Sequence, residues 1–200
     1  MIHNLAYEEK VEQIRENLDS VKSRMKDAAE RSDRNFEDIK LIAVSKLMPL
    51  DVIRAGIEAG ISRFGENYPE QAAEKISALA ADASIEWHMI GHIQSRKTDT
   101  VCEYFDIVHS VDRMKIARYL DRYSRERGRV MPILIEVNLS GEKSKYGWQA
   151  SDEAGWQDLI PQFRQISELQ NIEIRGLMSM PPFFENPALT RPIYTRLQEF

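Results

Sequence analysis

The stretch that decides the fold is Ile39-Lys40-Leu41-Ile42-Ala43-Val44-Ser45-Lys46-Leu47-Met48-Pro49-Leu50-Asp51. Its apolar run is typical of a buried parallel strand over residues 40–45, and Pro49 suits the first turn of a following helix. Lys46 would then stand at the carboxyl end of a strand, where α/β folds line their ligand crevice. A partly desolvated amine there has a lowered pKa and can condense with an aldehyde or ketone to give an imine. The alternative is that Lys46 only marks the strand end and extends into water.

The remaining chain alternates between strand and helix signals. Before the first strand, apolar residues three and four apart predict a helix over residues 5–31. Further strands are predicted over residues 61–65, 86–91, 105–111, 132–139 and 172–180. Helices are predicted from Pro49 to Gly60, from Pro69 to residue 81, near 94–103, from a cap at Asp112 to Gly128, and over 151–169 and 187–200. Pro161 predicts a kink or a restart within its helix.

Strands separated by helices of this length form right-handed crossover units and hence a parallel sheet. The fold class is therefore α/β. Six strands suit an open doubly wound sheet, whereas a closed (β/α)₈ barrel needs eight strands and typically ~250 residues. Periodicity does not choose between the two.

Composition indicates one domain over residues 1–200, because 42% hydrophobic content suffices for one core. A net charge of -5 argues against a nucleic-acid surface. The single cysteine, Cys102, fits a reducing compartment. The chain begins without the pattern of a signal peptide, and no segment has the ~20 apolar residues of a membrane span. We therefore expect a cytoplasmic monomer.

Polar residues gather where the predicted strands end. They are Lys46, Glu66, Asn67, His88, His92, Ser110, Asp112, Asn138, Ser140 and Ser179. Parallel strand ends converge on one crevice, and these groups favour holding a small polar ligand over hydrolysis.

No GxGxxG motif, which would indicate a dinucleotide site, follows a predicted strand. The pair His88 and His92 is more typical of hydrogen-bonded strand-end histidines than of a metal site. The loop over residues 138–147 carries two lysines and is either a flap over an anionic ligand or a solvated loop.

Six ordered segments resemble the pyridoxal phosphate homeostasis protein family over nearly the whole chain. They are Ala43-Val44-Ser45-Lys46, Phe64-Gly65-Glu66-Asn67-Tyr68, Trp87-His88-Met89-Ile90-Gly91-His92-Ile93-Gln94-Ser95, His109-Ser110-Val111-Asp112, residues 137–147 and Arg175-Gly176-Leu177-Met178. The resemblance implies a (β/α)₈ TIM barrel similar to the N-terminal domain of alanine racemase, with an extra N-terminal helix. It also implies pyridoxal 5'-phosphate bound as an aldimine on Lys46.

The resemblance further implies a set of cofactor-binding residues, no catalytic residues and no metal. The set is Lys46, Asn67, His88, Asn138, Lys145 and Met178. Members of the family are thought to carry or buffer the cofactor and to support amino-acid and keto-acid balance, with pyridoxal phosphate-dependent apoenzymes as recipients. This chain has no second domain to supply the opposing base that racemases of this barrel type use. The alternatives are a racemase or decarboxylase on the same barrel and an aldolase whose lysine forms an imine without a cofactor.

The chain departs from the family pattern at two places. Met48 stands where the family often has a second lysine, so Lys145 is the remaining candidate amine for transfer of the cofactor. The family's seventh and eighth strands, which cradle the phosphate and the pyridine nitrogen, have no counterpart before Phe200. We therefore expect a barrel truncated after the sixth strand-helix unit.

Overall fold

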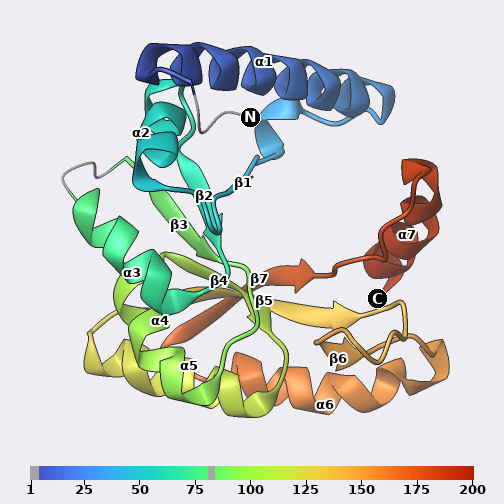
Figure 1. Cartoon of the computed structure of the whole chain (residues 1–200). Helices are drawn as coiled ribbons and strands as arrows, with labels where there is room; N and C mark the ends of the chain where they lie inside the picture. Colours follow the sequence, from blue (N-terminus) through green and yellow to red (C-terminus); the bar gives the residue numbers. More distant parts are fainter. Residues whose placement is uncertain (1–4, 81–83) are drawn as a thin grey trace.

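The computed structural model describes residues 5–80 and 84–200. Its described part contains one curved sheet whose strands are all parallel to their neighbours (Figure 1). The strands are β1 (Ala43–Val44), β2 (Arg63–Glu66), β3 (Glu86–Met89), β4 (Ile107–Val111), β5 (Met131–Asn138), β6 (Trp148–Gln149) and β7 (Ile172–Met178). Strands β1 to β5 are neighbours in sequence order. Beyond β5, β7 pairs with most of β5, and β6 pairs with the last two residues of β5. The predicted α/β class and parallel order are confirmed.

Helices follow the strands as the sequence predicts. They are α1 (Tyr7–Arg31), α2 (Leu50–Glu58), α3 (Pro69–Ala78), α4 (Thr98–Tyr104), α5 (Met114–Glu126), α6 (Trp156–Ser167) and α7 (Arg191–Glu199). Gly60 and Gly128 follow α2 and α5 with φ of 98° and 62°, the left-handed conformation that ends helices and that glycine adopts at little cost. Both predicted helix ends are therefore confirmed.

The main core lies between the sheet and the helices α2 to α6, which cover its outer face (Figure 1). Alternate residues of the strands supply it, among them Trp87, Met89, Ile133 and Ile135. Burial of each such side chain stabilises the fold by roughly 1.5–3 kcal/mol. Helix α1 packs on α2 through a separate small cluster that contains Val11. The opposite, inner face of the sheet carries the polar side chains considered below.

The first predicted strand is much shorter in the structure than the sequence indicates, and one short strand was not predicted. Of the strand predicted over residues 40–45, only Ala43–Val44 forms β1, although the Ser45 amide still bonds to Gly65 of β2, and Val44 is exposed. The reason is that β1 pairs with β2 alone among the described strands, so its other edge and inner face lack cover. The two-residue strand β6 was not predicted, because a strand of this length has no detectable period.

The predicted N-cap of α5 is wrong, and of the two alternatives predicted for Pro161, a kink or a restart, the restart is not found. Arg113, and not Asp112, is the N-cap of α5, and the Asp112 carboxylate instead pairs with Arg113 and with His92. Helix α6 runs through Pro161 without a restart. Pro161 falls in the second helical turn and removes one backbone hydrogen bond, which burial of Leu159 and Ile166 in the same helix outweighs.

None of the helices within residues 5–80 and 84–200 combines the length and the apolar character that crossing a bilayer requires.

Candidate functional site

A cavity of about 650 Å³ opens at the carboxyl edge of the sheet. Its walls come from the loops after β2, β3 and β5. The lining residues are Asn67, Tyr68, Pro69, Glu70, Ile90, Gly91, His92, Gln94, Arg96, Lys97, Glu136, Ser144, Lys145, Tyr146 and Met180. Ligands of parallel α/β proteins bind at this edge because the strand-helix loops converge there. Two of the six predicted site residues, Asn67 and Lys145, line the cavity.

Lys46 lies in a tight turn directly after β1. The Ser45 amide donates to the Gly65 carbonyl at 3.0 Å, and the Met48 amide donates to the Ser45 carbonyl at 3.0 Å, which closes the turn. Leu47 has φ of 62°, a left-handed conformation that costs a residue with a side chain about 1–2 kcal/mol. Lys46 is exposed, so the expectation of a partly desolvated amine is wrong for this structure. The uncovered edge of β1 explains the exposure.

Asn67 occupies the corresponding place after β2. The register pairs Val44 with Gly65, so Lys46 and Asn67 each lie two residues further along neighbouring strands. The Asn67 side-chain oxygen is buried and has no hydrogen-bond partner. Because an unpaired buried acceptor is costly, this atom is a natural contact for a ligand donor.

Gly91 packs against Asn67 and fixes the position of its backbone. A Cβ atom at Gly91 would lie 2.6 Å from both the Cα atom and the carbonyl oxygen of Asn67. The Ser110 hydroxyl of β4 donates to the Gly91 carbonyl at 2.6 Å and so holds the Gly91 backbone from the side of β4. The absence of a side chain at Gly91 therefore sets the separation of β2 and β3 at the cavity.

We expect Gly91→Ala to destabilise the protein, because the new methyl group meets backbone that cannot yield as a side chain would. Overpacking of this kind costs roughly 1–3 kcal/mol, which lowers the thermal midpoint of a chain of this size by roughly 2–12 °C. Calorimetry measures the shift. Gly155→Ala is the matched control, since nothing lies within 4 Å of a Cβ atom there. Equal midpoints for the two variants would contradict the packing argument.

His88 lies within β3 and does not line the cavity. Its Nδ1 atom is 2.9 Å from His109 Nε2. Burial lowers the pKa of His88, and burial together with the nearby His88 lowers the pKa of His109 to about 4. The two imidazoles are therefore neutral at pH 7 and form a buried hydrogen-bonded pair on the inner face. A contact between His88 and a cofactor stays a prediction.

Asn138 ends β5 and organises the loop that follows it. Its side-chain oxygen accepts from the Ser140 hydroxyl at 3.1 Å and from the Gly141 amide at 3.0 Å. Its side-chain nitrogen donates to the Glu142 carbonyl at 3.0 Å and to the Lys145 carbonyl at 3.4 Å. Asn138 thus acts on the cavity through the loop, and a direct contact with a ligand stays a prediction.

The loop brings Lys145 to the cavity wall. The Lys145 ammonium is 2.5 Å from the Glu142 carboxylate, and this hydrogen bond lowers the pKa of Glu142. Only 18% of the Lys145 side chain is exposed. Of the two interpretations of this loop, a wall beside a ligand site agrees better with the geometry than a solvated loop, because Lys145 faces inward.

Glu136 is a cavity residue that the sequence analysis missed. Glu136 pairs in register with Met178 of β7. Met178, one of the six predicted site residues, is half-buried and does not line the cavity. Burial, with a smaller effect of the Asp112 charge, raises the pKa of Glu136 to about 7. One of its carboxyl oxygens is buried without a partner. A single acidic residue in a stretch, 132–139, that is apolar apart from Asn138 was the available signal.

His92 and Tyr146 also line the cavity, although neither was among the predicted cofactor contacts. Their rings stack with centroids 3.6 Å apart, and His92 Nδ1 is 2.9 Å from the Asp112 carboxylate. Arg96 donates to the neutral Gln94 side chain, whereas Lys97 pairs with Glu70. The Arg96 cation beside a neutral partner, the aromatic rings and the unpaired polar atoms together suit a small planar anion. The residues present therefore fit a phosphorylated aromatic cofactor.

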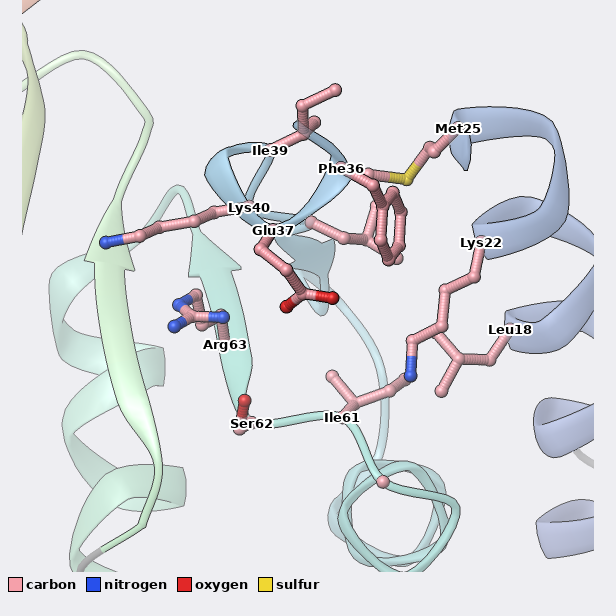
Figure 2. Close-up of a pocket in the computed structure, with 12 residues that line it drawn as sticks. Leu18, Lys22, Met25, Phe36, Glu37, Ile39, Lys40, Ile61, Ser62 and Arg63 are labelled. Atoms are coloured by element: carbon pink, nitrogen blue, oxygen red, sulfur yellow. The ribbon is translucent and has the colours of Figure 1, made fainter. Parts of the chain in front are cut away.

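A second cavity of about 380 Å³ lies at the opposite, amino-terminal edge of β1 and β2. Figure 2 shows Leu18, Lys22 and Met25 of α1 facing Glu37 and the start of β2 across it. This edge is remote from the strand ends that carry the predicted site residues. In the described ranges, no group of three or more His, Cys, Asp or Glu residues is placed to hold a metal ion.

Comparisons with known proteins agree with this architecture. Residues 11–200 match the family model described as alanine racemase, N-terminal domain. The chain is 38% identical over 190 residues to the pyridoxal phosphate homeostasis protein of Pseudomonas aeruginosa, covering 93% of this chain and 78% of that protein. The protein of the same name from Vibrio cholerae is 37% identical over 192 residues, with the same two coverages.

Solved structures show the same fold. PipY of Synechococcus elongatus PCC7942, solved with pyridoxal phosphate bound, is 33% identical, with a TM-score of 0.77 over 93% of this chain and 79% of that chain. Alanine racemase from Streptomyces coelicolor has a TM-score of 0.61 at 16% identity, over 91% of this chain and 49% of that chain, and supports the fold alone. The predicted barrel type is thereby confirmed, and the chain belongs to the pyridoxal phosphate homeostasis protein family with an alanine racemase N-terminal fold.

Proposed function

We propose that this chain binds pyridoxal 5'-phosphate through Lys46 and the cavity beside it. The cofactor supplies an aldehyde that condenses with an amine, forming a carbon-nitrogen double bond and releasing one water without oxidation or reduction. The observation that carries the proposal is the place of Lys46, directly after β1 and beside Asn67 with its unpaired buried oxygen. A solved relative at 33% identity holds pyridoxal phosphate, which supports the assignment.

We propose a carrier or buffer that supports cofactor and amino-acid balance and has no catalytic turnover. The exposed Lys46 is open to incoming amines, which suits exchange of the cofactor with recipient apoenzymes. Lys46 itself is not among the cavity-lining residues, whereas Lys145 offers an amine on the cavity wall. Relatives are named homeostasis proteins, which agrees with this role. A single cofactor-binding domain over residues 1–200, a monomeric state and a cytoplasmic location complete the proposal.

The optical spectrum tests the proposal. Protein mixed with an equimolar amount of pyridoxal phosphate should gain the absorption band of a protonated imine, and borohydride should bleach it and fix the cofactor to one peptide. A spectrum equal to the sum of free cofactor and free protein would reject the proposal. A protein that stays colourless and is trapped by borohydride only with a keto acid would be an aldolase.

The competing function is a racemase or decarboxylase. It needs a base opposite Lys46, and the two phenols that could serve, Tyr68 and Tyr146, both line the cavity. Deuterium exchange at the α-carbon of amino acids in deuterated water distinguishes the two classes. A carrier should exchange at most about one equivalent per protein, whereas an enzyme exchanges many.

A further inference from the structure

A buried ionic network lies beneath the Lys46 turn. The Lys75 ammonium donates to the Glu66 carboxylate at 2.8 Å and to the Ser45 carbonyl at 3.0 Å. The Ser45 hydroxyl donates to the same carboxylate oxygen at 2.8 Å. Glu66 is fully buried, and only 14% of the Lys75 side chain is exposed. Neither Lys75 nor Glu66 lines either of the two cavities described above.

The network joins three elements at the residue before Lys46. Glu66 ends β2, Lys75 comes from the C-terminal half of α3, and Ser45 follows β1. The Ser45 carbonyl oxygen accepts hydrogen bonds from both the Met48 amide and the Lys75 ammonium. Lys75 therefore binds the same oxygen atom whose hydrogen bond to Met48 closes the turn. The strained Leu47 backbone persists only where the surrounding structure holds it.

We propose that Lys75 and Glu66 are positioning residues for Lys46. They fix the Ser45 peptide, and thereby the turn that aims the Lys46 amine toward an aldehyde bound beside Asn67. A charged pair with one partner fully buried is costly to bury and does not by itself stabilise a fold, which leaves room for a functional reason for this pair. This inference rests on the proposed role of Lys46 as the imine-forming residue.

The test begins with cofactor-free protein. Native-state hydrogen exchange should show the Met48 amide exchanging at least about tenfold faster in Lys75→Met than in the wild type, because the carbonyl that accepts it loses its anchor. Lys75→Arg, which keeps a cationic donor, should recover most of the protection. Glu66→Gln keeps the accepting oxygen but weakens the hold on Lys75, and its exchange rate should lie between the two.

The same variants are then titrated with pyridoxal phosphate and read by the imine band. The apparent dissociation constant should rise about tenfold in Lys75→Met and recover in Lys75→Arg. Lys10→Met is the matched control, because Lys10 is another buried lysine, paired with Asp51 at the start of α2. It should lose comparable stability while keeping wild-type Met48 exchange and wild-type imine formation.

The outcomes separate the two proposals. If wild-type protein forms no imine, the proposed function fails, and the exchange experiment still decides whether Lys75 holds the turn. If the wild type forms the imine and Lys75→Met matches it in both measurements, the positioning role is overturned. Equal losses in Lys75→Met and Lys10→Met would overturn it too, since general destabilisation would then explain both.

Discussion

Lys46→Ala should abolish covalent retention of pyridoxal phosphate. Removing the only amine that directly follows β1 removes the attacking nitrogen while leaving the cavity walls intact, since Lys46 is exposed and none of the cavity-lining residues is changed. After reduction with borohydride and proteolysis, the modified peptide containing residue 46 should disappear. We expect the total trapped cofactor to fall at least about tenfold, because the imine that borohydride reduces can no longer form at this position.

Two further variants make this result specific. Lys115→Ala removes an exposed lysine of α5 and should trap as much cofactor as the wild type. Lys145→Ala removes the candidate transfer amine on the cavity wall and should leave the adduct on Lys46. A wild-type yield in Lys46→Ala, with the adduct on Lys145, would move the attachment point to the loop after β5.

The position of Lys46 could be predicted from the sequence because strand ends obey a simple rule. An apolar run followed by a polar residue and then proline marks a strand, its end and a helix start. Parallel strands bring such ends to one edge, which is why Asn67 and Lys145 do share one cavity. The ordered family motifs added the barrel type, which periodicity left undecided.

Contacts between side chains could not be predicted in the same way. His88 and Asn138 lie near the carboxyl edge of the sheet, as expected. However, His88 is hydrogen-bonded to His109, and Asn138 is hydrogen-bonded to the loop after β5. Such partners are distant in sequence or depend on loop geometry. The exposure of Lys46 was also beyond prediction, because it depends on which strands cover β1.

The burial of Glu136 was missed for a related reason. A lone carboxylate within an apolar strand signals a special environment, but the sequence does not say whether a cation meets it. In the structure the negative charge of Asp112 opposes ionisation of Glu136, so burial and repulsion both raise its pKa. This makes Glu136 a cavity group whose charge changes near neutral pH.

The stability of the cofactor-free protein should therefore depend on Glu136 between about pH 4.5 and about pH 7. The folded state keeps the proton up to a pKa of about 7, whereas the unfolded state loses it near the ordinary value of 4.5. Because the folded state binds more protons in this interval, stability falls as pH rises through it and stays lower above it. At 1.36 kcal/mol per unit, the loss is about 3 kcal/mol.

Glu136→Gln isolates this effect because glutamine resembles the protonated acid and does not titrate. Urea unfolding from pH 4 to 8 should give equal stabilities for variant and wild type at the acid end. The variant should become more stable by about 3 kcal/mol above pH 7. Glu173→Gln, which changes an exposed glutamate of β7 paired with Arg175, should follow the wild-type curve throughout. Parallel curves for Glu136→Gln and wild type would mean that Glu136 ionises as readily in the folded cavity as in water, and that the cavity admits enough solvent to stabilise its charge.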